Sequence, residues 1–181
     1  ELEGEYVVSV GRASWVKGAW ETISMLSGSG VALAHVGGGD EGDLLKLKGH
    51  AKSMGVGLWC APRLSSPELA SLYRGALAVV SMAHGEPFGL TPIEAQSVGT
   101  PALFVDEGGF RETIVDGVSG RLLPREGFDE WHRALSEARD PGNRSSWSKN
   151  GRVAISEAGL DPGGHCDRLI AILQDMNSDL S

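Results

Sequence analysis

A strand is predicted at Tyr6-Val7-Val8-Ser9-Val10, a short run rich in β-branched residues that ends in a turn at Gly11. A helical pattern follows over 18–26, and Val31-Ala32-Leu33-Ala34-His35-Val36 is a second apolar run. Continuously apolar strands separated by helices are typical of a parallel sheet that is covered on both faces. Because crossovers between parallel strands are right-handed, this unit predicts a Rossmann-like α/β domain.

The same alternation continues along the chain. Further strands are predicted at 56–61, 76–82, 101–106 and 120–123. The helices between them are predicted at 43–54, from Ser66 to about residue 74, and from near Thr91 and near Gly109. Ser65 and Glu68 have the spacing of a capping box at the start of one of these helices. From Gly127 onward the pattern is helical, with helices at 128–138, 145–158 and 165–176. We therefore predict one domain over 1–181, a doubly wound parallel sheet with helices on both faces and a helical C-terminal tail.

Composition and charge exclude several classes of protein. Glycine accounts for 26 of the 181 residues and hydrophobic residues for 41%, and the glycines follow no collagen-like period, so fibres and disorder are excluded. The net charge of −8, without a cluster of Lys and Arg, argues against a nucleic-acid partner. Cys60 and Cys166 are too few for a disulfide framework or a zinc site, and the chain has neither a signal peptide nor a run of 18 apolar residues. We therefore expect a cytoplasmic protein.

The first candidate site lies in the segment 11–18, between the first strand and its helix, where a ligand would bind beyond the carboxyl end of the strand. Lys17 lies beside the positive end of a helix, where a cation is disfavoured unless an anion binds there. Arg12 offers a planar guanidinium to the same anion. The competing interpretation is a pair of solvated surface cations. The segment is neither a Walker loop nor a dinucleotide fingerprint.

The second candidate site is Gly85-Glu86-Pro87-Phe88-Gly89-Leu90-Thr91-Pro92-Ile93-Glu94-Ala95. Gly89 and Leu90 offer backbone amides just before a predicted helix, which favours an anion. Glu86 and Glu94 are spaced so that both carboxylates are expected to face one crevice and to accept hydrogen bonds from sugar hydroxyls. The competing interpretation makes Glu94 the partner of Thr91 in a capping box, with Pro92 as the first helical residue.

Two glycine-rich segments complete the predicted edge. Gly37, Gly38 and Gly39 follow the second strand, and Gly108 and Gly109 follow the run ending at Asp106. Glycines at strand ends allow a ligand to approach the backbone closely. For Gly108 and Gly109, an ordinary tight turn with Glu112 capping a short helix is the competing interpretation.

The ordered motifs resemble a known family. Gly-Arg-x-x-x-x-Lys-Gly, Gly-x-Gly after the second strand, Glu-Pro-Phe-Gly-Leu-Thr-Pro-Ile-Glu-Ala, Gly-Thr-Pro and Glu-Gly-Gly-Phe-Arg-Glu follow one another between about residues 8 and 124. This series is similar to the carboxy-terminal domain of retaining GT-B glycosyltransferases of the group 1, or family 4, type. The sequence from Phe88 to Ala95, which includes Glu94, is similar to that of mannosyltransferase-like members. The chain departs from the family at 81–85, where the usual Pro-Ser is missing, and at 60–62.

The resemblance implies a role for each of these residues. Arg12 and Lys17 would hold the diphosphate of a nucleotide-sugar, Glu94 would bind the ribose hydroxyls, and Glu86 would contact the transferred sugar. The remaining implied contacts to the donor are Gly11, Gly37, Gly38, Gly39, Arg63, Phe88, Gly89, Leu90, Thr91, Gly108 and Gly109. Positive groups already in place would make a metal unnecessary, so neither a metal nor a further cofactor is expected.

The implied function is the donor-binding half of a retaining enzyme that moves a hexose, with mannose as one candidate. In the family, an amino-terminal domain binds the acceptor, and no such domain precedes Glu1. We therefore expect a fragment that binds nucleotide-sugar but turns nothing over alone, taken from a protein that binds the membrane surface peripherally. The alternatives are a stand-alone nucleotide-sugar-binding or regulatory subunit, and an epimerase or phosphorylase of the same architecture.

Overall fold

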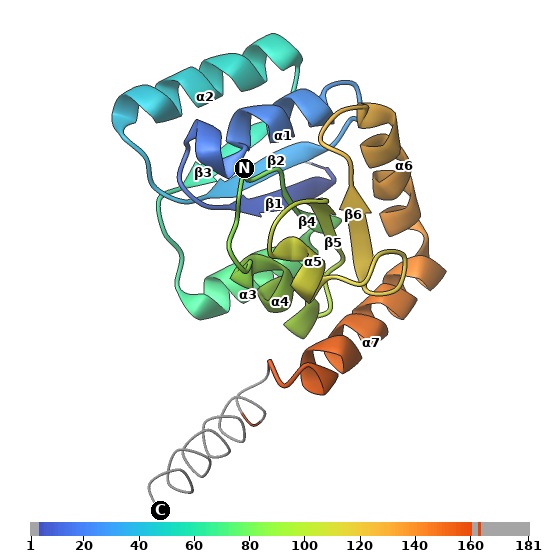
Figure 1. Ribbon diagram of the computed structural model, residues 1–181. Helices are drawn as coiled ribbons and strands as arrows, with labels where there is room; N and C mark the ends of the chain where they lie inside the picture. Colours follow the sequence, from blue (N-terminus) through green and yellow to red (C-terminus); the bar gives the residue numbers. More distant parts are fainter. Residues whose placement is uncertain (1–3, 161–162, 164–181) are drawn as a thin grey trace, which may run out of the picture.

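Six parallel strands form the centre of the protein (Figure 1). The computed structural model describes residues 4–160 and residue 163. The strands are β1 (Tyr6–Val10), β2 (Ala32–Val36), β3 (Leu58–Ala61), β4 (Ala78–Ser81), β5 (Ala102–Val105) and β6 (Gly120–Leu123). All six strands that the sequence predicts are therefore confirmed.

The strand order is β3-β2-β1-β4-β5-β6. The chain builds outward from β1 to β3, then returns to the other side of β1 and builds outward again through β4 to β6. The connections that follow β1 and β4 therefore begin at the same edge of the sheet and run to opposite faces of it. Ligands of doubly wound folds bind in the crevice at this reversal.

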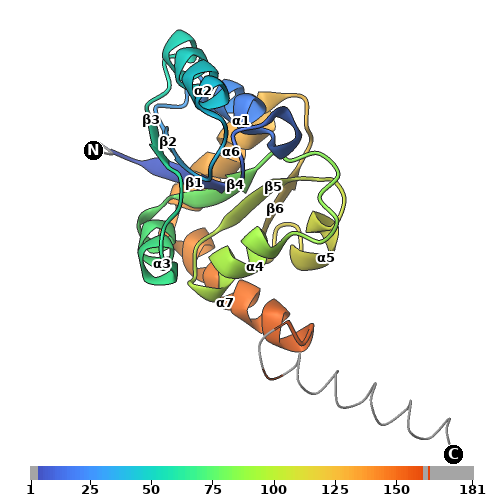
Figure 2. The same ribbon diagram turned by 90° about the vertical axis from the view of Figure 1, so that its left-hand side faces the viewer.

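Helices cover both faces of the sheet, as predicted (Figure 2). One face carries α1 (Ala19–Leu26), α2 (Glu41–Met54) and α6 (Phe128–Arg139), and the other carries α3 (Ser66–Gly75), α4 (Leu90–Ser97) and α5 (Phe110–Thr113). The last described helix, α7 (Pro141–Glu157), packs against both α6 and α4. A single 3₁₀ turn, Trp15–Lys17, precedes α1.

The apolar runs of the strands lie in the core. Val7 and Val8 of β1, Val79 of β4 and Leu103 and Phe104 of β5 are completely buried. Each of these strands is packed by helices on both faces, which explains why apolar residues follow one another in their sequences instead of alternating with polar ones.

Two helix starts can be compared with those expected from the sequence. The Ser65–Glu68 capping box is confirmed, since the Glu68 carboxylate accepts a hydrogen bond of 2.8 Å from the Ser65 N–H. The predicted start of a helix at 145 is wrong, because Asp140 caps α7 by accepting from the Asn143 N–H and Pro141 begins the helix. The helix predicted at 165–176 lies outside the described residues.

Candidate functional site

The loops that follow β1 and β4 meet at the reversal of strand order. Lys17 ends the 3₁₀ turn after β1, and its Nζ lies 2.7 Å from Oε2 of Glu86, which follows β4. The two side chains are 41% and 22% exposed, so both groups of this ion pair are accessible to a ligand. The structure thus brings together a predicted phosphate-binding cation and a predicted sugar-binding carboxylate from distant parts of the sequence.

Two further contacts fasten these loops to each other. The His84 N–H donates a hydrogen bond of 2.8 Å to the carbonyl of Val16. The rings of Trp15 and His84 stack with centroids 4.1 Å apart, although Trp15 remains 65% exposed. The Lys17–Glu86 pair therefore lies on two loops that are held in register by both backbone and side chains.

A cavity of about 460 Å³ opens beside this ion pair. Its far wall is the start of α4, where Gly89 is the N-cap and no side chain caps the helix. The first N–H groups of a helix have no partners within the helix, so a ligand anion can accept hydrogen bonds from them. The predicted site residues that line this cavity are Gly11, Lys17, Glu86, Phe88, Gly89, Leu90 and Thr91.

Arg12 lies in a second hollow of about 540 Å³, with Gly38, Gly39 and Asp40 among its lining residues. The structure therefore does not place Arg12 and Lys17 in one hollow, although only four residues separate them in the sequence. Arg63 is exposed just after β3 and lines neither hollow.

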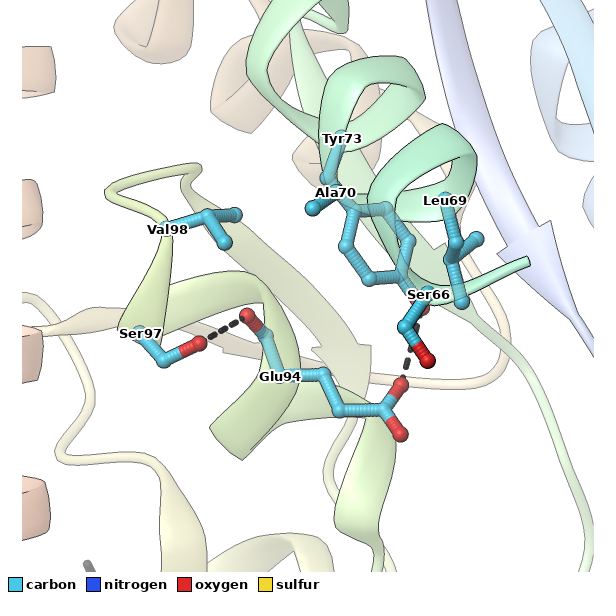
Figure 3. A pocket seen from close by; sticks show the side chains of 7 residues that line it. All are labelled: Ser66, Leu69, Ala70, Tyr73, Glu94, Ser97 and Val98. Atoms are coloured by element: carbon cyan, nitrogen blue, oxygen red, sulfur yellow. Dashed lines mark hydrogen bonds between the residues drawn. The ribbon is translucent and has the colours of Figure 1, made fainter. Parts of the chain in front are cut away.

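Glu94 lines a third hollow, of about 260 Å³, between α3 and α4 (Figure 3). The two carboxylates therefore face separate hollows rather than the single crevice expected. The capping-box interpretation of Thr91 and Glu94 is wrong, because α4 begins at Leu90 and Thr91 is already helical. The Glu94 carboxylate instead accepts a hydrogen bond of 3.0 Å from the hydroxyl of Tyr73.

The glycines of the edge pack mainly against other loops. A β-carbon at Gly37 would collide with the backbone of Gly11, and one at Gly109 would collide with the backbone of Pro87 and Phe88. The Gly109 N–H also donates to the carbonyl of Glu86. We expected these glycines to admit a ligand, but at Gly37 and Gly109 the close approach is between two loops of the protein. Capping of α5 by Glu112 is not observed either.

Arg125, which the motifs did not indicate, holds several of these loops together. Its guanidinium donates two hydrogen bonds to the Glu107 carboxylate, at 2.8 and 2.7 Å, and two to the carbonyls of Met82 and Ala83. The hydrogen bonding from Arg125 holds the pKa of Glu107 below its usual range, although partial burial of the carboxyl group acts in the opposite direction. The available signal was position alone, since Arg125 follows a predicted strand and therefore lies at the same edge.

Known proteins match the chain over most of its length. The profile of the family described as "Glycosyl transferases group 1" covers residues 1–154. The chain belongs to this family. D-inositol 3-phosphate glycosyltransferase of Kribbella flavida is 42% identical over 93 residues, which is 51% of this chain and 21% of that protein. The enzyme of the same name from Actinosynnema mirum is 38% identical over 108 residues, or 58% of this chain and 26% of that protein.

Solved structures agree with this assignment and show the GT-B type of fold. Sucrose-phosphate synthase from Thermosynechococcus elongatus matches with a TM-score of 0.77 and 25% identity, over 94% of this group 1 domain and 46% of that chain. Anabaena Alr3699/HepE in complex with UDP-glucose matches with a TM-score of 0.71 and 21% identity, over 85% and 44%. The domain thus spans about half of these chains and about a quarter of the sequence relatives. Among residues 4–160 and 163, no helix is long and apolar enough to cross a membrane.

Proposed function

We propose that this domain binds the nucleotide-diphospho-sugar donor of a retaining hexosyltransferase. The observation that carries the proposal is the Lys17–Glu86 pair, which lies at the topological switch point beside the uncapped start of α4. Cations and helix N-termini stabilise phosphate oxygens, and carboxylates accept hydrogen bonds from sugar hydroxyls. The named ligand of the Anabaena neighbour, UDP-glucose, is a molecule of this class.

Each partner of the ion pair has a place in the reaction. Cleavage of the bond between sugar and diphosphate leaves negative charge on the departing phosphate. Lys17 and the N–H groups of α4 would stabilise that charge as it develops, which lowers the barrier without any bound metal. Glu86 would orient the sugar through its hydroxyls, and we assign it no covalent role. The anomeric configuration of the product, measured by NMR with the full-length protein, tests retention.

The direct test is calorimetric titration of the domain with UDP, GDP and ADP and then with UDP-glucose, GDP-mannose and ADP-glucose. One nucleoside diphosphate should bind, and Lys17→Ala should weaken it by at least about tenfold, the loss of one charge-assisted hydrogen bond. Lys46→Ala is the matched control, since Lys46 lies on α2, outside the cavity, and its ion-pair partner within the described part of the chain is Asp43, at 3.7 Å. Binding of none of the six ligands, or equal loss in both variants, would refute the proposal.

The titrations with the three nucleotide-sugars also test whether mannose is the hexose. The acceptor to try first with the full-length protein is D-inositol 3-phosphate, after the name of the relatives. Cytoplasmic location, peripheral membrane binding and independence from metals remain predictions.

A further inference from the structure

Tyr73 connects α3 to the carboxylate of Glu94. It lies in the last turn of α3, its side chain is 2% exposed, and its hydroxyl donates to Oε2 of Glu94 across the hollow between the two helices (Figure 3). Among the described residues, the Tyr73 hydroxyl and the Glu94 carboxylate make no other hydrogen bond. No sequence pattern indicates this pair, because its members lie 21 positions apart.

The backbone of Tyr73 is anchored at the end of α3, and its ring lies beside a mainly apolar hollow. The Tyr73 carbonyl accepts hydrogen bonds of 2.8 Å from the Thr100 hydroxyl and 3.0 Å from the Ala76 N–H, which anchor its backbone. The hollow beside its ring is otherwise mainly apolar, with Leu69 and Val98 among the lining residues. Burial and the nearby carboxylate raise the pKa of Tyr73, so the hydroxyl remains a donor over the range in which proteins are folded.

One oxygen of Glu94 is therefore held and the other is available. Oε2 accepts from Tyr73, whereas Oε1 has no hydrogen-bond donor among residues 4–160 and 163. An ionised carboxylate has about four lone-pair positions, so one bond from Tyr73 leaves enough acceptors for two hydroxyls. A carboxylate fixed in one orientation loses less rotational freedom when it binds a vicinal diol.

We propose that Tyr73 is a positioning residue for recognition of the donor's ribose, and that it acts by orienting the Glu94 carboxylate toward the 2′- and 3′-hydroxyls. This inference rests on the proposed function, and it takes from the family resemblance the ribose contact that is implied for Glu94. It predicts that the Tyr73 hydroxyl contributes to discrimination between ribonucleotides and dideoxynucleotides, and contributes nothing to the diphosphate contacts on Lys17.

The test compares the tightest-binding nucleoside diphosphate with its 2′,3′-dideoxy form, by calorimetry on the same domain. We expect the unaltered domain to prefer the ribonucleotide. Tyr73→Phe should weaken the ribonucleotide by roughly three- to tenfold and leave the dideoxynucleotide unchanged, the effect of removing one hydrogen bond that organises a charged acceptor. Glu94→Gln should remove most of the preference, and adding Tyr73→Phe to it should cause little further loss.

Tyr6→Phe is the matched control. The Tyr6 hydroxyl donates a hydrogen bond of 3.0 Å to the carbonyl of Leu72, so the variant loses a similar bond to the same helix without touching Glu94. Thermal unfolding of both variants measures their cost in stability. Equal weakening of both nucleotides by Tyr73→Phe, or an unchanged preference, would overturn the inference while leaving the proposed function intact. An unaltered domain that binds no nucleotide would overturn both.

Discussion

Replacing Glu86 by Gln should tighten the binding of a free nucleoside diphosphate, although Glu86 belongs to the proposed donor site. In the structure Lys17 is already paired with Glu86 at 2.7 Å. A diphosphate that takes Lys17 must break this pair and leaves an unpaired carboxylate beside its own negative charge. For the free diphosphate, Glu86→Gln removes both costs. For the nucleotide-sugar, it also removes the carboxylate that accepts hydrogen bonds from the sugar. The substitution should therefore act in opposite directions on nucleotide and nucleotide-sugar.

The size of each effect follows from the exposure of the pair. Because the two side chains are 41% and 22% exposed, the ion pair is of the partly solvated kind that contributes about 0.2–1 kcal/mol. Because Glu86→Gln removes this ion pair from the unliganded domain, the domain should bind the diphosphate more tightly, by up to about fivefold. Loss of one charge-assisted hydrogen bond to a sugar hydroxyl costs about 1.5–3 kcal/mol. The nucleotide-sugar should therefore bind more weakly by about tenfold or more, relative to the nucleotide.

Calorimetry at low and moderate salt measures both effects. The gain for the diphosphate should shrink as salt rises, because the pair is partly exposed to solvent. Glu112→Gln removes one negative charge from the same edge and contacts neither member of the pair, so it reports the general effect of charge. If Glu86→Gln weakens the free diphosphate, Glu86 does not compete for Lys17 and the assignment of the two groups is wrong.

Three further predictions concern stability. Gly18→Ala should destabilise the domain by roughly 1–3 kcal/mol in urea, because Gly18 has a φ of 66° and a β-carbon would collide with the Met82 carbonyl, whereas Gly49→Ala, in open space on α2, should stabilise it by about 0.5–1 kcal/mol; equal effects would show that the collision is relieved. Burial lowers the pKa of His35, so the stability that its neutral form contributes is present above the unfolded value near 6.5 and is lost as the pH falls below it. In urea titrations, the free energy of unfolding should change less between pH 7.5 and 5.5 in His35→Asn than in the unaltered domain. An equal change in both would show that other groups cause the pH dependence. Arg125→Lys should cost about 1–3 kcal/mol, because one ammonium nitrogen cannot replace the three guanidinium nitrogens that contact the Glu107 carboxylate and two backbone carbonyls in different directions. A loss within error would contradict this.

The fold was predictable because each strand carries its own local signal. β1, β4 and β5 each carry consecutive apolar residues that are buried, and a parallel sheet covered on both faces is the arrangement that buries them. Helix starts were less predictable, since several short motifs can cap one helix. At α7 the N-cap is Asp140. At α4 the N-cap is Gly89, whereas the Thr91–Glu94 spacing predicted an N-cap two residues later, at Thr91.

The chemistry of the site was predictable only in part, because strand ends can be located from sequence but side-chain partners cannot. Lys17 and Glu86 both follow strands, so their meeting at one edge is a consequence of topology. The pairing of Glu94 with Tyr73 depends on the packing of α3 against α4, and no spacing encodes it. Arg125 likewise acts through contacts with residues up to 104 positions away, which local patterns do not reveal.

The glycine-rich edge has a structural purpose that precedes ligand binding. Loops at the carboxyl ends of parallel strands must pack on one another before they can present amides, cations and carboxylates in a fixed geometry. A β-carbon at Gly37 or Gly109 would separate two of these loops by collision with backbone, which no rotamer change can relieve. Because ordering a loop after a ligand arrives costs binding free energy, loops that are already fastened together bind more tightly for the same contacts. The glycines therefore support recognition of the donor by excluding space between the loops, and the groups that would touch the donor are the side chains and helix N–H groups that those loops hold in place.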